Sequence, residues 1–271
     1  MTLFFVIIIA CVSAAIYFGQ DRMFFYPREY GQNSALQLER YQKITFETAK
    51  DGPQMAYYLG PENEAGLEKL WILTGGNGSL ALHMDFLATP VCKQNPKMGC
   101  LLVEYPGYGV NAGKPSRKGI QEVMEGSMTA LAAHLEIDTE GLKSLSSFLG
   151  HSLGGAVALE VAAKWNRSEV IVISPFTSIK AMAKRMVGGP LSNLARHRWD
   201  NEDAIRKITE QRDDAKIFIF HGAKDRIVPV EMGRALSKIA PKQTFYAEYP
   251  TYGHNEIGYE LRQQLIARMI Q

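Results

Sequence analysis

The residue whose setting points most directly to chemistry is Ser152. It lies in the sequence GHSLGG (150–155), after an apolar strand-like run and before a helix-like run. A serine on a sharp strand-to-helix turn presents its hydroxyl to a substrate, while glycines on either side let neighbouring segments approach closely. The N-terminus of the helix also stabilises negative charge that develops nearby. The pattern predicts Ser152 as a nucleophile, and a tight turn with only a structural role is the alternative.

A serine hydroxyl is a weak nucleophile, so it needs a base that an acid orients. Asp225 follows the apolar run IFIFHG, and His254 follows the run FYAEYP. In a site built on a strand-to-helix turn of this kind, the acid and the histidine come after the serine in chain order. We therefore predict that His254 takes the proton of Ser152 and that Asp225 holds the ring of His254.

The other histidines and carboxylates lack this placement. His151 is expected to pack beside the serine, and His221, which precedes a glycine at a strand end, is expected to make a structural hydrogen bond. Asp213 and Asp214 precede a strand, so they are expected at the wrong end of the sheet. The remaining histidines show no partner pattern: His83, His134 and His197.

Acyl transfer also needs two N–H donors for the oxygen that becomes negatively charged. One is expected to be the backbone N–H of Leu153, directly after the serine. The other is expected from the glycine-rich loop 75–79 after the run LWILT, with Asn77 as the first choice and Gly76 as the alternative. This loop lacks the terminal Gly-Lys-Ser/Thr of a phosphate-binding loop, so we set that function aside.

The elements that must position these groups alternate along the chain. Two early strands, KITFETA and QMAYYLG, are predicted around a turn at 51–53. They are followed by short apolar runs typical of strands buried on both faces: LWILT, CLLVEY, LSSFLG, VIVIS, IFIFHG and FYAEYP. Helical spacing occurs over 120–135, 153–165, 231–239 and 256–270. The alternation predicts an α/β fold, a mostly parallel sheet of about eight strands with helices on both faces.

One stretch interrupts the alternation. Residues 175–214 separate two predicted strands, contain Gly-Gly-Pro in the middle and carry several basic residues. A segment of this length exceeds an ordinary crossover. We predict that it forms a small helical cap over the site, within an α/β domain that spans 43–271.

The N-terminus departs from a globular profile. Residues 3–19 carry no charged side chain, a length at the short end of what crosses a bilayer. A cleaved signal peptide would carry a positive charge before the run and a buried helix would show a polar face, so a single-pass membrane anchor over 1–20 fits best. Arg22 and Arg28 follow the run and favour a cytoplasmic domain, but two charges leave the side of the membrane open.

The segment that follows, 21–42, is predicted as an amphipathic connector rich in aromatic residues near its start. Aromatic rings and arginines are at home in the headgroup region of a bilayer, so one interpretation places the connector there. The other interpretation is that it packs on the domain.

The composition limits the partners that the chain can have. Of its 271 residues, 46% are hydrophobic, and 30 Lys and Arg balance 28 Asp and Glu. This profile excludes a disordered chain and gives no reason to expect a nucleic-acid partner. No cluster has metal-ligand spacing, and neither a cofactor nor an obligate protein partner is expected. Cys92 and Cys100 flank a polar loop and could be free thiols or a disulfide.

These residues together resemble a known family, the small-cap α/β hydrolases. Members of this group often carry an N-terminal membrane anchor, and they include the protein depalmitoylases and many bacterial proteins. The resemblance runs over most of the chain from Asp21 onward. It rests on these motifs, in the family's order: FFYP (24–27), Gly76-Asn77, EYPGYG (104–109), GKPS (113–116), GHSLGG, SPFTSI (174–179), HGAKDRIVP (221–229) and GHNE (253–256). In one departure, Gly75-Gly76 stands where the family usually has His-Gly.

The resemblance implies the α/β-hydrolase fold and an esterase or thioesterase activity. With the residues above, it predicts a serine hydrolase that cleaves carboxylic ester or thioester bonds through an acyl-enzyme, with a small-molecule or acylated substrate. An anchor would bring the site near a bilayer, which favours acyl-chain substrates. Two alternatives stay open: a peptidase on the same fold, limited to short peptides, and a non-catalytic binding module, against which the complete Ser, Asp and His set argues.

Overall fold

The structure is a computed structural model. It describes residues 4, 11, 13–14, 17–22, 24–31, 39–61 and 66–271. Most of the predicted anchor over 1–20 therefore lies outside the described residues, and so do residues 32–38 of the predicted connector. Among the residues that are described, no helix has both the length and the apolar character needed to cross a membrane.

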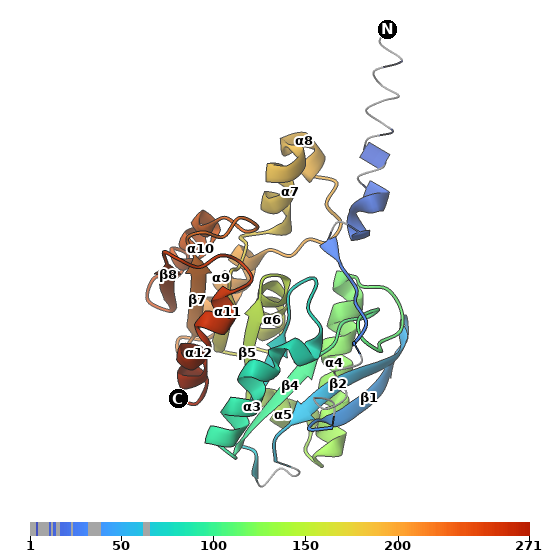
Figure 1. Ribbon diagram of the computed structural model, residues 1–271, viewed down its shortest axis with the longest axis vertical. Coiled ribbons are helices and arrows are strands. Elements are labelled where there is room, and N and C mark those ends of the chain that lie inside the picture. Colours follow the sequence, from blue (N-terminus) through green and yellow to red (C-terminus); the bar gives the residue numbers. More distant parts are fainter. Residues whose placement is uncertain are drawn as a thin grey trace.

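A single sheet of eight strands forms the centre of the described structure (Figure 1). In chain order the strands are β1 Gln42–Thr48, β2 Gly52–Leu59, β3 Lys69–Thr74, β4 Met98–Val103, β5 Ser146–His151, β6 Glu169–Ile173, β7 Lys216–Gly222 and β8 Thr244–Tyr249. Their order in the sheet is β1-β2-β4-β3-β5-β6-β7-β8. Strand β2 pairs antiparallel with β1 and β4, and the other pairs are parallel. The predicted α/β fold with a mostly parallel sheet is confirmed.

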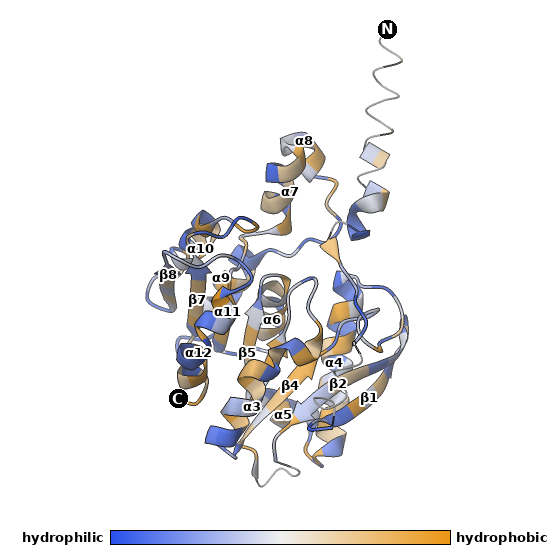
Figure 2. Ribbon diagram, viewed as in Figure 1, coloured by the Kyte–Doolittle hydropathy of each residue, from blue (hydrophilic) through white to orange (hydrophobic). Residues whose placement is uncertain are grey.

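The central strands are buried on both faces because successive side chains of a strand point to opposite sides of the sheet. In β3, Leu70 and Ile72 belong to one hydrophobic core, and Trp71 and Leu73 belong to the other. All four side chains are fully buried. Figure 2 shows the apolar residues gathered in the strands and on the helix faces that cover them. This double core explains why the strands appear in the sequence as continuous apolar runs.

Helices cover both faces of the sheet. The first core contains residues of α4 Arg117–His134, α5 Thr139–Ser144, α6 Leu153–Lys164, α9 Asn201–Gln211 and α10 Val230–Ser237. The second contains residues of η3 Ala81–Met84, α3 Asp85–Gln94, α11 Ile257–Glu260 and α12 Arg262–Met269. The helix predicted over 256–270 is thus interrupted at Leu261, where the backbone leaves helical geometry (φ −89°, ψ 7°).

The predicted cap range, 175–214, contains two different structures. Helices α7 Ile179–Val187 and α8 Gly189–Ser192 project beyond the sheet, beside the described N-terminal residues (Figure 1). Helix α9 instead packs on α6 and covers the sheet. The projecting part is closed at its base by an antiparallel bridge between Ser178 and Asp200. The cap proper is therefore the excursion between these two residues.

The start of the connector packs on the domain. Phe25 is 3% exposed and its ring lies edge-on to His197, with 5.0 Å between the ring centroids. Asp21 Oδ1 lies 2.6 Å from both Arg196 and His197 Nε2. Gln20 Oε1 accepts a hydrogen bond from the backbone N–H of Arg196 at 2.7 Å. These contacts join the N-terminal segment to the cap. In the structure, Gln20, Asp21 and Phe25 therefore pack on the domain, which is the second of the two interpretations of the connector.

Candidate active site

Ser152 sits between β5 and α6 in a backbone conformation that few serines adopt. Its φ is 55° and its ψ is −116°, which costs about 1–3 kcal/mol for a residue with a side chain. The turn fits only because its neighbours lack side chains. A Cβ on Gly150 would lie 2.2 Å from the carbonyl oxygen of Gly154, and one on Gly154 would lie 2.1 Å from that of Thr74. The two glycines are therefore required by the packing of the turn.

Asp225 and His254 come together from the loops after β7 and β8. Asp225 Oδ2 lies 2.6 Å from His254 Nδ1. The other carboxylate oxygen accepts hydrogen bonds from the backbone N–H groups of Ile227 at 2.9 Å and Val228 at 2.8 Å. Both oxygens of Asp225 are thus engaged, which fixes the carboxylate and leaves Nε2 of His254 as the free nitrogen of the ring.

The Asp225 carboxylate is ionised in its buried position. Burial alone would raise its pKa, but the side chains of His221 and His254 together hold the pKa well below its ordinary value. His221 Nε2 lies 3.4 Å from Asp225 Oδ2 and 3.0 Å from the carbonyl oxygen of Val228. The sequence predicted only a structural hydrogen bond for His221. The structure adds that this histidine borders the acid that orients His254.

His151 lies against His254 but does not compete with it as a base. Burial, and then the nearby ring of His254, lower the pKa of His151 to about 4, so it is neutral near pH 7. Its Nε2 lies 2.9 Å from the backbone carbonyl oxygen of His254, to which a neutral ring can donate. A Cβ on Gly76 would lie 3.1 Å from the opposite nitrogen, Nδ1. The ring packs beside the serine, as the sequence predicted, between the His254 loop and the loop of Gly76.

Two tyrosines hold the loop expected to supply the second oxyanion donor. The Tyr108 hydroxyl donates to the carbonyl oxygen of Asn77 at 2.6 Å, and the Tyr105 hydroxyl donates to that of Gly75 at 2.9 Å. The side-chain amide of Asn77 donates to the carbonyl oxygen of Phe24 at 3.0 Å. Sequence reasoning did not assign these tyrosines a role. The repeated aromatic in EYPGYG, directly after β4, was the available signal.

The two predicted oxyanion donors remain available. Leu153 is the first residue of α6, where a backbone N–H has no carbonyl of a preceding turn to bind. Within the described part of the chain, neither this N–H nor that of Asn77 has a hydrogen-bond acceptor. Ser152, Leu153 and Asn77 line the same cavity, whereas Gly76, the alternative donor, lies against His151 and is not among the lining residues.

The cavity has a volume of about 540 Å³ and a mainly apolar lining. Phe24 and Tyr26 of the N-terminal segment form part of its wall, and Phe176 follows β6. Helix α7 contributes Ile179, Met182, Arg185 and Met186, and the Asp225 loop contributes Arg226, Ile227 and Val228. The site is thus enclosed by the sheet end, the cap and the N-terminal segment together.

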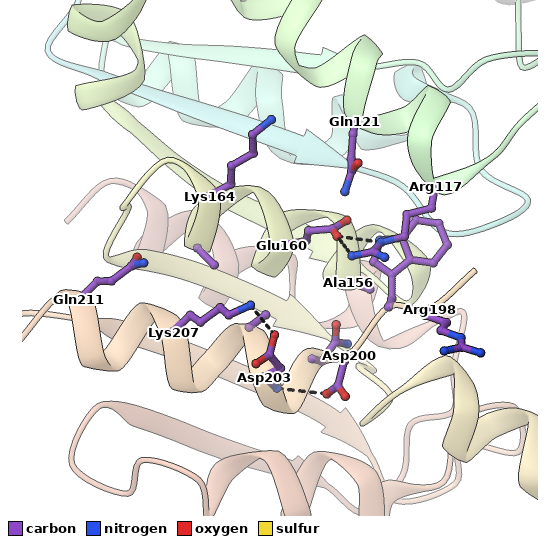
Figure 3. A pocket seen from close by; sticks show the side chains of 14 residues that line it. Arg117, Gln121, Ala156, Glu160, Lys164, Arg198, Asp200, Asp203, Lys207 and Gln211 are labelled. Atoms are coloured by element: carbon purple, nitrogen blue, oxygen red, sulfur yellow. Dashed lines mark hydrogen bonds and ion pairs between the residues drawn. The ribbon is translucent and has the colours of Figure 1, made fainter. Parts of the chain in front are cut away.

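A second hollow of about 430 Å³ lies apart from these residues, among α4, α6 and α9 (Figure 3). Most of the residues that line it are charged or polar, and none is a predicted site residue. Arg117 Nε binds Glu160 at 2.8 Å, and Lys207 lies 2.7 Å from Asp203. Elsewhere, Cys92 and Cys100 are free thiols. Among the residues that the structure describes, no group of His, Cys, Asp and Glu side chains could hold a metal ion.

Comparisons with known proteins identify relatives of this chain by sequence. No protein-family model matches the chain. An uncharacterised protein of Mycobacterium tuberculosis is 26% identical over 257 residues, which cover 93% of this chain and 87% of the relative. Protein bem46 of Schizosaccharomyces pombe is 30% identical over 59% of this chain and 52% of its own length. The human α/β hydrolase domain-containing protein 17B is 27% identical over 62% of this chain and 54% of its own length.

Solved structures share the fold over nearly the whole chain. An α/β hydrolase of Vibrio vulnificus has a TM-score of 0.65 and 19% identity, covering 93% of this chain and 91% of that one. An esterase of Pyrococcus furiosus has a TM-score of 0.67 and 14% identity, covering 91% and 95%. The resemblance predicted from the sequence is confirmed: the chain has the α/β-hydrolase fold, and its relatives include α/β-hydrolase domain proteins.

Proposed function

We propose that the protein is a serine hydrolase that cleaves carboxylic ester or thioester bonds through an acyl-enzyme. The observation that carries this proposal is the buried Asp225–His254 pair, together with a strained Ser152 that lines an apolar cavity. The neighbour of the serine, His151, contacts the His254 loop through the carbonyl oxygen of His254 at 2.9 Å. A serine in a sparsely populated conformation, an ionised acid holding a histidine and two free N–H groups are the parts that acyl transfer needs.

In the proposed reaction, Ser152 Oγ attacks the acyl carbonyl carbon while His254 Nε2 takes the hydroxyl proton. Asp225 stabilises the positive charge that the imidazole gains, and the N–H groups of Leu153 and Asn77 bind the negatively charged oxygen. His254 then donates the proton to the departing alcohol or thiol, and an ester to Ser152 remains. A water molecule, deprotonated by His254, releases the acid and restores the serine. Each oxyanion donor is expected to contribute about 3–4 kcal/mol to transition-state stability.

The test is covalent labelling with a fluorophosphonate probe. Ser152→Ala is expected to abolish labelling, and His254→Ala to slow it strongly, because the serine is then not activated. Ser144→Ala is a matched control, since Ser144 is an exposed serine on α5, before the start of β5, whereas Ser152 follows the end of that strand. Circular dichroism establishes that each variant is folded. A folded wild-type protein that is not labelled, or labelling that persists in Ser152→Ala, would contradict the proposal.

We also propose that residues 1–20 anchor the enzyme in a bilayer. The support is the uncharged run over 3–19, together with the position of Phe24 and Tyr26, which follow this run and line the cavity. The cavity would then open close to acyl chains. Fractionation of cells that express the full chain, beside a variant that lacks residues 1–19, tests this. Recovery of the full chain in the soluble fraction would contradict the anchor and would leave the hydrolase proposal standing.

A further inference from the structure

The cavity over Ser152 has an unbalanced charge. Arg185 and Arg226 are among the residues that line it, and no Asp or Glu is among the described residues that do so. Within the described part of the chain, neither guanidinium has a hydrogen-bond or ion-pair partner. An arginine presents several N–H donors in a planar fork that suits phosphate and carboxylate groups. The lining therefore combines an apolar wall with two unmatched cations.

The exposure of the neighbouring residues shows that Arg185 and Arg226 lie at the outer end of the cavity. Along α7, Ile179, Met182 and Met186 line the cavity at spacings that share one helix face. Ile179 is 3% exposed and Met186 is 62% exposed, so this face runs from the interior to the surface. Arg185 is exposed beside Met186, at the outer end. Arg226 is likewise exposed, and it follows Asp225 directly.

We propose that the substrate carries a phosphate group on its leaving-group side, and that Arg185 and Arg226 bind this phosphate at the mouth of the cavity. The inference rests on the proposed hydrolase function of Ser152. The acyl chain lies against the apolar wall, and the phosphorylated alcohol or thiol lies at the exposed rim, where it can leave after the proton from His254 reaches its oxygen or sulfur. Two sources share this chemistry: lysophospholipids, which are oxygen esters, and acyl-coenzyme A thioesters.

The experiment compares substrates with one acyl chain and two kinds of leaving group. Octanoyl lysophosphatidate is compared with monooctanoylglycerol, and octanoyl-coenzyme A with the neutral thioester of N-acetylcysteamine, all below their micellar concentrations. The readout is the ratio of kcat/KM for the phosphorylated substrate to that for its neutral counterpart. A ratio well above one for the ester pair identifies the lysophospholipid class, and a ratio well above one for the thioester pair identifies the acyl-coenzyme A class.

The variants Arg185→Gln and Arg226→Gln are each expected to lower this ratio about tenfold, the scale of one hydrogen bond to a charged group. The ratio in the wild-type protein is also expected to fall with added salt, because exposed charges are screened. Arg206→Gln is the control, since Arg206 is an exposed arginine on α9 that pairs with Glu202 and is not among the cavity residues. It is expected to leave the ratio unchanged.

A wild-type ratio near one for both pairs, or a ratio that stays unchanged in a variant carrying both Arg185→Gln and Arg226→Gln, would overturn the phosphate inference. In that case hydrolysis of the neutral substrates that depends on Ser152 would leave the hydrolase function intact. Failure of every substrate together with failure of fluorophosphonate labelling would instead overturn the hydrolase function itself. The two failures are therefore distinguishable in one set of assays.

Discussion

The two hollows of the molecule differ in how their charges are satisfied. In the groove among α4, α6 and α9, Arg117 is paired with Glu160 and Lys207 with Asp203 (Figure 3). In the cavity over Ser152, Arg185 and Arg226 have no partner among the described residues. The charges of these two ion pairs in the groove already have partners, so a charged ligand gains little by binding them. This difference supports the proposal that the cavity over Ser152, and not the groove, binds the substrate.

The largest loss of activity that would test the difference between the two hollows is expected when Asp225, the acid that binds His254, is replaced. Asp225→Asn is expected to lower kcat for p-nitrophenyl octanoate about 10⁴-fold, because the amide no longer holds the active tautomer of His254 or its positive charge. Asp203→Asn, an acid of the groove, is the matched control and is expected to leave kcat within about twofold. Equal losses of kcat in Asp225→Asn and Asp203→Asn would contradict the proposed functional difference between the two hollows.

A pH-dependent difference in stability is expected from His151. Its folded-state pKa of about 4 lies below the unfolded value of about 6.5, so between these pH values only the unfolded chain holds the proton. The contribution of neutral His151 is complete above pH 6.5 and is lost as the pH falls toward 4, by up to about 3 kcal/mol. Urea unfolding at several pH values should show this loss in the wild-type protein and not in His151→Gln.

The control for that series is His134→Gln, since His134 is an exposed histidine that lies 2.7 Å from Gln42 and borders neither hollow. This variant is expected to keep the wild-type dependence on pH. If His151→Gln loses stability with falling pH as steeply as the wild-type protein does, then His151 is not the group that resists protonation in the folded state.

A smaller effect is expected from Tyr108→Phe, which removes the hydroxyl that binds the carbonyl oxygen of Asn77. A less firmly held oxyanion loop is expected to lower kcat about tenfold, with a smaller change in KM. Tyr58→Phe is the control, because Tyr58 also has a buried ring and its hydroxyl donates to the carbonyl oxygen of Pro61, at a site remote from Ser152. A loss of kcat in both variants would point to general destabilisation, and unfolding midpoints would show it.

The smallest effect is expected in the groove. Arg117→Gln breaks a partly exposed ion pair with Glu160, and such pairs contribute about 0–1 kcal/mol to stability. We expect a change in the free energy of unfolding within that range and no change in kcat/KM. A tenfold fall in kcat/KM would show that the groove takes part in the reaction, and the contrast between the two hollows would have to be redrawn.

The alternation of strands and helices could be predicted because the central strands are buried on both faces. Each apolar run then marks a strand, and the ends of the parallel strands mark where loops carry chemistry. This reasoning placed Asp225 and His254 on loops after β7 and β8, and the structure brings the two within hydrogen-bond distance. The helical pair η3 and α3 was not predicted, since it follows a glycine-rich loop and contains Pro90, a residue that usually interrupts helices.

Contacts between distant segments could not be predicted from one sequence. The pairing of Asp21 with His197 joins residues 176 positions apart in the chain, and nothing local to either residue signals it. The same holds for Tyr108, whose hydroxyl reaches Asn77 across the end of the sheet. The sequence indicated which residue types could react, but the partners that hold them depend on a tertiary arrangement that spacing does not encode.

The bridge at the base of the cap has a consequence for how the cap of such a protein can change in evolution. On either side of the bridge between Ser178 and Asp200, the N–H of Ile179 binds the carbonyl oxygen of Trp199 and the N–H of Asn201 binds that of Thr177. The chain leaves and rejoins the core at almost one point, through backbone groups that any sequence can supply. Ile179 and Trp199, at the base, belong to the core, so a change of length between them is expected to leave the strand ends that carry Ser152, Asp225 and His254 in place. If the proposed function holds, the substrate preference of such a protein can change in evolution while the proposed catalytic residues keep their positions.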